Sequence, residues 1–220
     1  MIAIVPVRKD SERVTNKNIR SFANSTLLEI KINQLKRIGL FDQIIVSSDC
    51  ANMLNVSRLL GVDTHTRDPK YCNANTPMKE VYKYLANEFI TNDAIAYVNV
   101  TNPLLLDETI NMCVESFRNA DEDIISVNTV HEVRDFMWHM GNPVNYDPYN
   151  QPRSQDLPKY TALNFACNII RTNVMKEMGI VVGMPHIEVP IDKIQALDID
   201  DLEDFEIAET LYNKRLKGKP

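Results

Sequence analysis

Hydrophobic residues along the chain form short runs that are separated by longer stretches with helical periodicity. Short apolar runs bounded by polar turns are typical of buried strands. They predict strands at 2–7, 43–47, 95–100 and 124–127. Because these strands alternate with helical stretches, the pattern favours a parallel sheet with crossover helices.

The clearest helix is predicted over 26–38, where apolar side chains recur on one face and Gly39 follows as a stop signal. That face consists of Leu28, Ile32, Leu35 and Ile38. Further helices are expected at 51–60, 78–89, 108–119 and 202–216. The predicted fold class is α/β, with a Rossmann-like, mainly parallel sheet and flanking helices.

The segment 128–161 breaks this alternation, because prolines and aromatic residues replace the periodic pattern. It predicts a small insertion of loops or antiparallel hairpins, suited to a partner subunit or a pocket wall. We therefore expect one domain over 1–220 that carries this segment as a dimerisation arm in a homodimer. Trp138 in the arm is assigned to packing or to the dimer contact.

Composition narrows the classes of partner. The chain has 220 residues, 44% of them hydrophobic, which is enough for a full core. Its net charge of -6 gives no global basic field, so duplex nucleic acid is not an expected partner, and phosphates must be attracted by a local cluster.

The first residues carry neither a charged leader region nor an apolar run long enough for a signal peptide or membrane span. We expect a cytoplasmic protein with no membrane partner. The four cysteines have no zinc or disulfide spacing and are expected to be reduced core thiols; they are Cys50, Cys72, Cys113 and Cys167. The four histidines share no ligand spacing and are expected to be structural or exposed.

A basic segment, 8–18, directly follows the first predicted strand. In open parallel sheets, ligands bind beyond the carboxyl ends of the strands. No glycine occurs before Gly39, which excludes a P-loop and a dinucleotide-binding glycine turn, so side chains must supply positive charge for phosphates. Arg8, Arg13 and Lys17 are the candidates. A solvated charged loop explains the same composition, and the position after the strand favours phosphate binding.

Two carboxylates near the other end, Asp198 and Asp200, are two residues apart. On an extended chain both face one side while Ile199 turns inward, an arrangement that suits Mg²⁺. Helix capping is the competing interpretation. We assign to capping the acidic residues Asp201, Glu203 and Asp204. Asp198 lies too early to cap the helix, and Asp200 can serve both roles.

Several segments in order resemble the acylneuraminate (CMP-sialic acid) cytidylyltransferase family. They are Ile4 to Arg8 with Ser11 and Lys17-Asn18, then 44–49, Arg67, 101–104 and 198–200. The family pattern is an R-x-x-S-K-x-x-x-x-K-N loop, an I-V-S-T-D strand end, an arginine, Q-P-T-S-P-L-R and D-I-D. The resemblance covers nearly the whole chain and implies a reaction of CTP with the hydroxyl of an acidic sugar, giving a CMP-sugar and pyrophosphate.

The resemblance also implies roles for individual residues. Nucleotide binding falls to Arg8, Ser11, Arg13, Lys17, Asn18, Arg67 and Asn99, and Mg²⁺ binding to Asp198 and Asp200. Catalysis is expected from Arg8, Lys17 and Asp200 during in-line attack on the α-phosphorus: Arg8 and Lys17 neutralise charge on the leaving pyrophosphate, and Asp200 holds Mg²⁺. Binding of the acidic acceptor is expected from Arg153, Gln155 and Asn164. A polar turn between prolines is the other interpretation of 151–158.

The chain departs from the family pattern at several positions. Glu12 replaces a lysine, whose charge Arg13 can supply, and Asn99 replaces a glutamine. On the acceptor side, Leu105, Ala162 and Phe165 replace an arginine, an arginine and a glycine. Three functions stay open from the sequence: transfer to a sialic-acid-like or other 2-keto sugar acid, transfer to a phosphonate or other acid, and a noncatalytic nucleotide-binding protein on the same fold.

Overall fold

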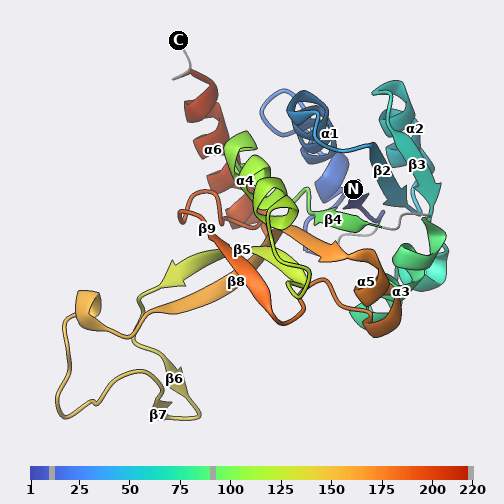
Figure 1. Cartoon of the computed structure of the whole chain (residues 1–220). Helices are drawn as coiled ribbons and strands as arrows, with labels where there is room; N and C mark the ends of the chain where they lie inside the picture. Colours follow the sequence, from blue (N-terminus) through green and yellow to red (C-terminus); the bar gives the residue numbers. More distant parts are fainter. Residues whose placement is uncertain (10–12, 90–92, 218–220) are drawn as a thin grey trace.

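The computed structural model describes residues 1–9, 13–89 and 93–217 (Figure 1). Seven strands form one twisted sheet in the order β3-β2-β1-β4-β8-β5-β9. Their bounds are β1 Ile2–Pro6, β2 Gln43–Ser48, β3 Asp63–Thr66, β4 Ala94–Val98, β5 Ser126–Val133, β8 Tyr160–Arg171 and β9 His186–Pro190. Strand β8 runs antiparallel to both β4 and β5, and the other pairings in this sheet are parallel.

Helices cover both faces of the sheet. They are α1 Leu27–Ile38, α2 Ala51–Leu59, α3 Met78–Glu88, α4 Asp107–Arg118, α5 Thr172–Met178 and α6 Leu202–Lys217, with short 3-10 turns η1 Lys17–Ile19, η2 Pro69–Tyr71 and η3 Ser154–Asp156. Core residues of α1, α4 and α6 pack on one face, and those of α3 and α5 on the other. The predicted Rossmann-like α/β class is confirmed.

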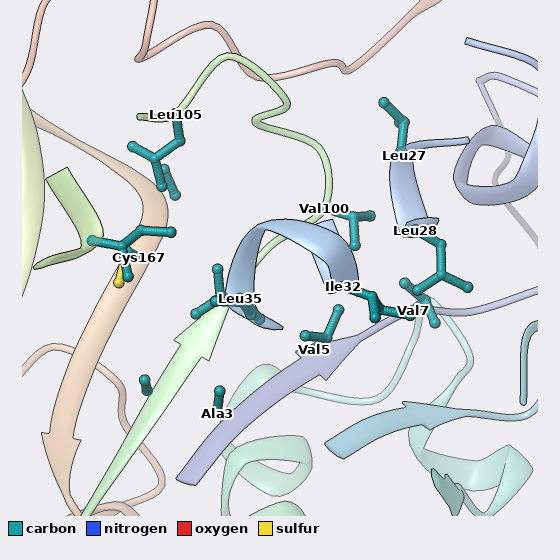
Figure 2. Packing of buried hydrophobic residues seen from close by; sticks show 14 of the residues in the cluster. Ala3, Val5, Val7, Leu27, Leu28, Ile32, Leu35, Val100, Leu105 and Cys167 are labelled. Atoms are coloured by element: carbon teal, nitrogen blue, oxygen red, sulfur yellow. The ribbon is translucent and has the colours of Figure 1, made fainter. Parts of the chain in front are cut away.

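Strand β1 shows why the sheet is buried on both faces. Ala3 and Val5 join the core under α1, whereas Ile2 and Ile4 join the core under α3, as the two-residue period of a strand requires. Figure 2 shows Ile32 and Leu35 of α1 above this strand. The packing of both helical layers against β1 thereby fixes the position of its carboxyl end.

The predicted helix over 26–38 is α1, and its ends follow the expected chemistry. The Thr26 hydroxyl accepts a hydrogen bond from the Glu29 amide at 3.1 Å, which caps the first turn. Gly39 adopts a φ of 67° and its amide donates to the Leu35 carbonyl, which ends the helix. The other predicted helices correspond to α2, α3, α4 and α6.

Four elements are additional to the prediction, namely β3, β8, β9 and α5. The strand predicted at 124–127 begins at Ser126 and continues to Val133 as β5, where it pairs with the start of β8. Residues 134–159, with the hairpin β6 Trp138–His139 and β7 Asn142–Pro143, project from the end of this ribbon (Figure 1). The segment expected as an arm thus begins inside the sheet, where Asn128 and Thr129 are buried.

The four cysteines are free and buried, as expected for core thiols. Within the described residues, no helix is both long enough and apolar enough to span a membrane.

Candidate functional site

A cavity of about 410 Å³ opens beyond the carboxyl ends of β1 and β4. Its position is the one expected for ligands of a parallel sheet. Predicted nucleotide-binding residues contribute much of its lining, namely Arg8, Arg13, Lys17, Asn18, Arg67 and Asn99, and Asp200 lies among them. Ser11, the remaining nucleotide-binding candidate, lies outside the described residues.

The basic loop is fastened to the rest of the sheet through its backbone. The Lys9 amide donates to Asp49 Oδ1 at 2.9 Å, so the strand-end aspartate of β2 anchors the loop. Asn18 Nδ2 donates to the Arg8 carbonyl at 3.2 Å across the loop. Arg8 Nη1 reaches the Cys72 carbonyl at 3.4 Å on the far side of the cavity. These contacts hold the loop backbone and the Arg8 side chain at the cavity.

The carboxylate segment faces this loop. Ile199 is fully buried while Asp198 and Asp200 are exposed, which confirms the predicted inward turn of Ile199. The Ile199 amide donates to the Thr101 carbonyl at 2.9 Å, which fixes the segment beside the end of β4. From the basic loop, Lys17 Nζ donates to the Ile199 carbonyl at 2.5 Å. The cationic side chains of the basic loop and the two carboxylates therefore lie close together.

The pKa directions follow from this arrangement. Desolvation lowers the pKa of Lys17, with Arg13 and Arg8 acting in the same direction against the raising effect of Asp198 and Asp200. The protein atoms around the Asp198 carboxyl displace enough water that desolvation raises its pKa, and the charge of Asp200 adds to this effect. A cation placed between the two carboxylates would reverse the shift of Asp198.

The donor set limits which ion can bind here. Within the described ranges, no cluster of three or more His, Cys, Asp or Glu side chains is arranged to hold a metal ion. The pair formed by Asp198 and Asp200 offers oxygen ligands only. Mg²⁺ commonly takes one or two protein carboxylates and completes its shell with water and substrate phosphates. The pair fits an ion of this kind.

Helix capping accounts for the acidic residues that follow the pair. The Asp204 amide donates to Asp201 Oδ1 at 3.0 Å, and Asp204 Oδ2 accepts from the Asp200 and Asp201 amides. This reciprocal cap confirms the predicted role of Asp201 and Asp204. The Asp200 carboxylate takes no part in it and instead forms an ion pair with Arg13, at 2.6 Å.

Arg67 has a structural role that the sequence does not indicate. Its side chain is 5% exposed, and its guanidinium donates to the Val7 carbonyl at 2.9 Å, to the Ser47 carbonyl and to Ser47 Oγ at 3.1 Å. Arg67 thus ties the ends of β1 and β2 together while it lines the cavity. Its contribution to nucleotide binding stays a prediction.

Asn99 connects the cavity to the antiparallel strand β8. Its Nδ2 donates to the Phe165 carbonyl at 3.0 Å. Phe165 adopts a φ of 53°, a left-handed conformation that is unusual for a bulky residue and that glycine adopts without strain. The departure from the family pattern at this position therefore carries a conformational cost beside the cavity.

The three acceptor candidates do not lie at the cavity of their own chain. Arg153, which precedes η3, and Gln155 within it are exposed in the arm, and Arg153 pairs with Asp156 at 2.7 Å. Asn164 is buried in β8, and its Oδ1 accepts from Thr129 Oγ1 at 2.6 Å. Their assignment to acceptor binding stays a prediction.

The segment after β3 supplies cavity residues that sequence reasoning misses. Tyr71, Asn73, Thr76 and Met78 line the cavity opposite the basic loop. Because β3 reads Asp-Thr-His-Thr, it lacks the apolar run by which the other strands are found. Its two β-branched threonines are the signal that could have placed this wall.

Comparisons with known proteins agree with this geometry. The family model described as Cytidylyltransferase matches residues 2–162. A pseudaminic acid cytidylyltransferase of Campylobacter jejuni is 25% identical over 96% of this chain and 95% of its own. An N-acylneuraminate cytidylyltransferase of Escherichia coli is 22% identical over 100% of this chain and 54% of its own. A solved CMP:2-keto-3-deoxy-manno-octonic acid synthetase complexed with CTP superposes with a TM-score of 0.72 at 12% identity, covering 97% of this chain and 98% of that one.

Proposed function

The chain belongs to the cytidylyltransferase family, and we propose that it transfers CMP from CTP to a sialic-acid-like nonulosonate or other 2-keto sugar acid, with release of pyrophosphate. The observation that carries this proposal is the meeting of two segments at one cavity. The basic loop after β1 supplies Arg8, Arg13 and Lys17, and the segment before α6 supplies Asp198 and Asp200. The proposed triphosphate and metal sites would thereby be adjacent.

We propose that Mg²⁺ is the cofactor and that Asp198 and Asp200 hold it. The support is the pair of oxygen ligands and the raised pKa of Asp198, which results first from desolvation and then from the charge of Asp200, and which a bound cation would offset. When bound, Mg²⁺ would supply positive charge to the phosphate oxygens that become more negative during transfer.

The chain's own cations complete the proposed reaction. A sugar hydroxyl oxygen forms a bond to the α-phosphorus of CTP and gives up its proton to solvent, while the bond from the α-phosphorus to the oxygen of the β-phosphate breaks and pyrophosphate leaves. Arg8 and Arg13 can grip phosphate oxygens in a forked geometry, and Lys17 acts as a point charge. Because these side chains are held in place before substrate arrives, catalysis rests on positioning and electrostatic stabilisation.

We propose that the arm forms a homodimer and carries Arg153 and Gln155 toward the cavity of the partner. The support is its projection from the body (Figure 1). The arm also exposes apolar side chains, including Trp138, Met140 and Tyr149. Exposed aromatic residues and methionine are common in interfaces. We also propose a cytoplasmic location, where CTP is formed and thiols stay reduced.

A panel of acceptors at constant CTP and Mg²⁺ tests the choice of substrate. We expect pyrophosphate release with nonulosonic acids and weaker release with shorter 2-keto sugar acids. Faster pyrophosphate release with a phosphonate or phosphate ester than with any sugar acid would show that the acceptor belongs to that class instead. Binding of CTP by calorimetry without release with any acceptor would contradict the enzymatic proposal.

A further inference from the structure

His65, at the end of β3, lies behind the cavity wall and contacts two residues that support it. Its Nδ1 is 2.9 Å from Ser47 Oγ, and its Nε2 is 3.3 Å from the Tyr84 hydroxyl. The side chain is 14% exposed and does not line the cavity itself. Both ring nitrogens are therefore engaged away from solvent.

Each contact leads to a residue that lines the cavity. Ser47 Oγ accepts from Arg67 Nε at 3.1 Å, and Arg67 lines the cavity beside the basic loop. The Tyr84 ring is stacked on Tyr71, with centroids 4.0 Å apart and planes at 10°, and Tyr71 lines the opposite wall. His65 thus connects two walls of one cavity through one intermediate residue each.

The hydrogen-bond directions select one form of the imidazole. Arginine can only donate, so Ser47 Oγ accepts from Arg67, and its own hydrogen can be donated to His65 Nδ1. In the tautomer that allows this bond, Nδ1 is unprotonated and the hydrogen on Nε2 is directed at the Tyr84 oxygen. This neutral tautomer satisfies every contact, whereas a hydrogen on Nδ1 would leave the serine hydroxyl without His65 as its acceptor.

The surroundings also disfavour the imidazolium. Burial lowers the pKa of His65 and the charge of Arg67 lowers it further, whereas Glu88 of α3, with Oε2 at 3.6 Å, raises it. The other groups that face the ring are the Tyr84 hydroxyl, the Ser47 hydroxyl and the Phe89 ring, which lies edge-on at 5.1 Å. Protonation at low pH would place a second cation near Arg67 and disturb the bond to Ser47.

We infer that neutral His65 is a positioning residue for nucleotide binding, because it fixes Arg67 through Ser47 and Tyr71 through Tyr84. The inference rests on the proposed function, since it takes CTP as the ligand of the cavity. It predicts that loss of the His65 contacts weakens CTP affinity and has little effect on the rate at saturating CTP. It also predicts weaker CTP binding as pH falls through the His65 titration.

The test compares His65→Phe with His65→Asn. Phenylalanine keeps a ring but removes both nitrogens, and asparagine retains an acceptor near the position of Nδ1. We expect His65→Phe to raise the Kd of CTP, measured by calorimetry, about three- to tenfold, which is the size of one or two hydrogen bonds. His65→Asn should recover part of the affinity, and kcat should stay within about twofold in both variants.

The pH profile separates positioning from a general loss of stability. Because the pKa of His65 is lowered by burial, the wild-type Kd of CTP should rise only as the pH falls below the ordinary histidine range, and this rise should be missing in His65→Phe. His186→Gln, at the β5–β9 edge of the sheet, is the matched control and should keep the wild-type profile. Ser47→Ala removes the hydroxyl that joins His65 to Arg67 and should also raise the Kd of CTP. This second variant keeps the test valid where His65→Phe folds poorly.

The outcomes distinguish this inference from the function on which it rests. Wild-type protein that binds no CTP would contradict the proposed function. Wild-type protein that binds CTP, together with unchanged Kd and pH profile in folded His65→Phe and Ser47→Ala, would overturn the role of His65 alone. A fall in kcat at constant Kd would overturn it as well.

Discussion

Arg13 Nη2 lies 2.6 Å from Asp200 Oδ1, and this ion pair joins two segments that are 187 residues apart in sequence. Both side chains are more than half exposed, at 63% and 53%, so the pair contributes little to the stability of the fold. Its consequence is local, because it places a cation and a carboxylate at the same side of the cavity. In the proposed complex, the triphosphate would pair with Arg13 and its metal ion with Asp200.

Asp200→Asn should remove most of the transferase activity, because the neutral amide keeps the shape of the carboxylate but loses its charge. We expect kcat to fall by about 100-fold or more, as is typical when charge stabilisation of a phosphoryl transfer is lost. The readout is pyrophosphate release at saturating CTP across a Mg²⁺ titration. Full activity in this variant would remove Asp200 from the proposed metal site.

The neighbouring aspartate supplies a matched control. Asp201 caps α6 through the Asp204 amide, so Asp201→Ala should lower the free energy of unfolding by about 1 kcal/mol, and Asp201→Asn by less. Both variants should keep kcat near the wild-type value. Denaturant unfolding and the pyrophosphate assay measure the two effects separately. A loss of activity in Asp201→Asn as large as in Asp200→Asn would show that the two aspartates do not have separate roles.

Lys31 of α1 gives a prediction about stability and pH. It is fully buried and donates to Gln34 Oε1 at 2.8 Å and to the Asn102 carbonyl at 3.3 Å. Burial lowers its pKa to about 8 from the usual 10.5, a difference that corresponds to about 3 kcal/mol. Between these two values the unfolded chain binds more protons than the folded one, so the free energy of unfolding rises with pH.

Lys31→Met should lack this rise. Urea unfolding between pH 7 and pH 10 measures the free energy of unfolding of wild type and variant. The difference between the two removes the contributions of the other titrating groups. Lys36→Met, at an exposed position of the same helix, is the control and should follow the wild type. Parallel curves for wild type and Lys31→Met would contradict the depressed pKa of Lys31.

The arm can be removed without cutting the sheet, because Val133 of β5 pairs directly with Tyr160 of β8. Replacing 134–159 with a short glycine-rich turn should therefore preserve the fold and CTP binding. We expect light scattering to show a dimer for the full chain and a monomer for the shortened one. A shortened chain that stays dimeric would contradict the proposed interface.

The apolar patterning predicts the layers of the fold well, because β1 and β4 are buried on both faces and consist mainly of hydrophobic residues. It fails where burial is incomplete. Strand β3 is short and polar, and β8 begins outside the core, where Tyr160 and Thr161 pair with β5 in the exposed ribbon. The antiparallel direction of β8 depends on the arm that precedes it, and a local pattern carries no information about that path.

The arrangement of the candidate site residues was predictable where it depends on local spacing, as for Asp198 and Asp200 on either side of the buried Ile199. It was not predictable where function depends on contacts between distant segments. The resemblance assigns Arg67 to nucleotide binding, and the structure adds that its guanidinium also bonds to Val7 and Ser47. Only the three-dimensional arrangement shows that Arg67 ties two strand ends together at the cavity wall.

The central claim is that the α-phosphate of CTP, with its nucleoside, moves to an acidic sugar. The most direct measurement follows two labelled forms of CTP in the presence of Mg²⁺ and a nonulosonic acid. The account predicts that an α-phosphate label appears in the sugar product while a γ-phosphate label appears in pyrophosphate. A γ-label in inorganic phosphate or on the sugar, with the α-label left in a free nucleotide, would contradict it.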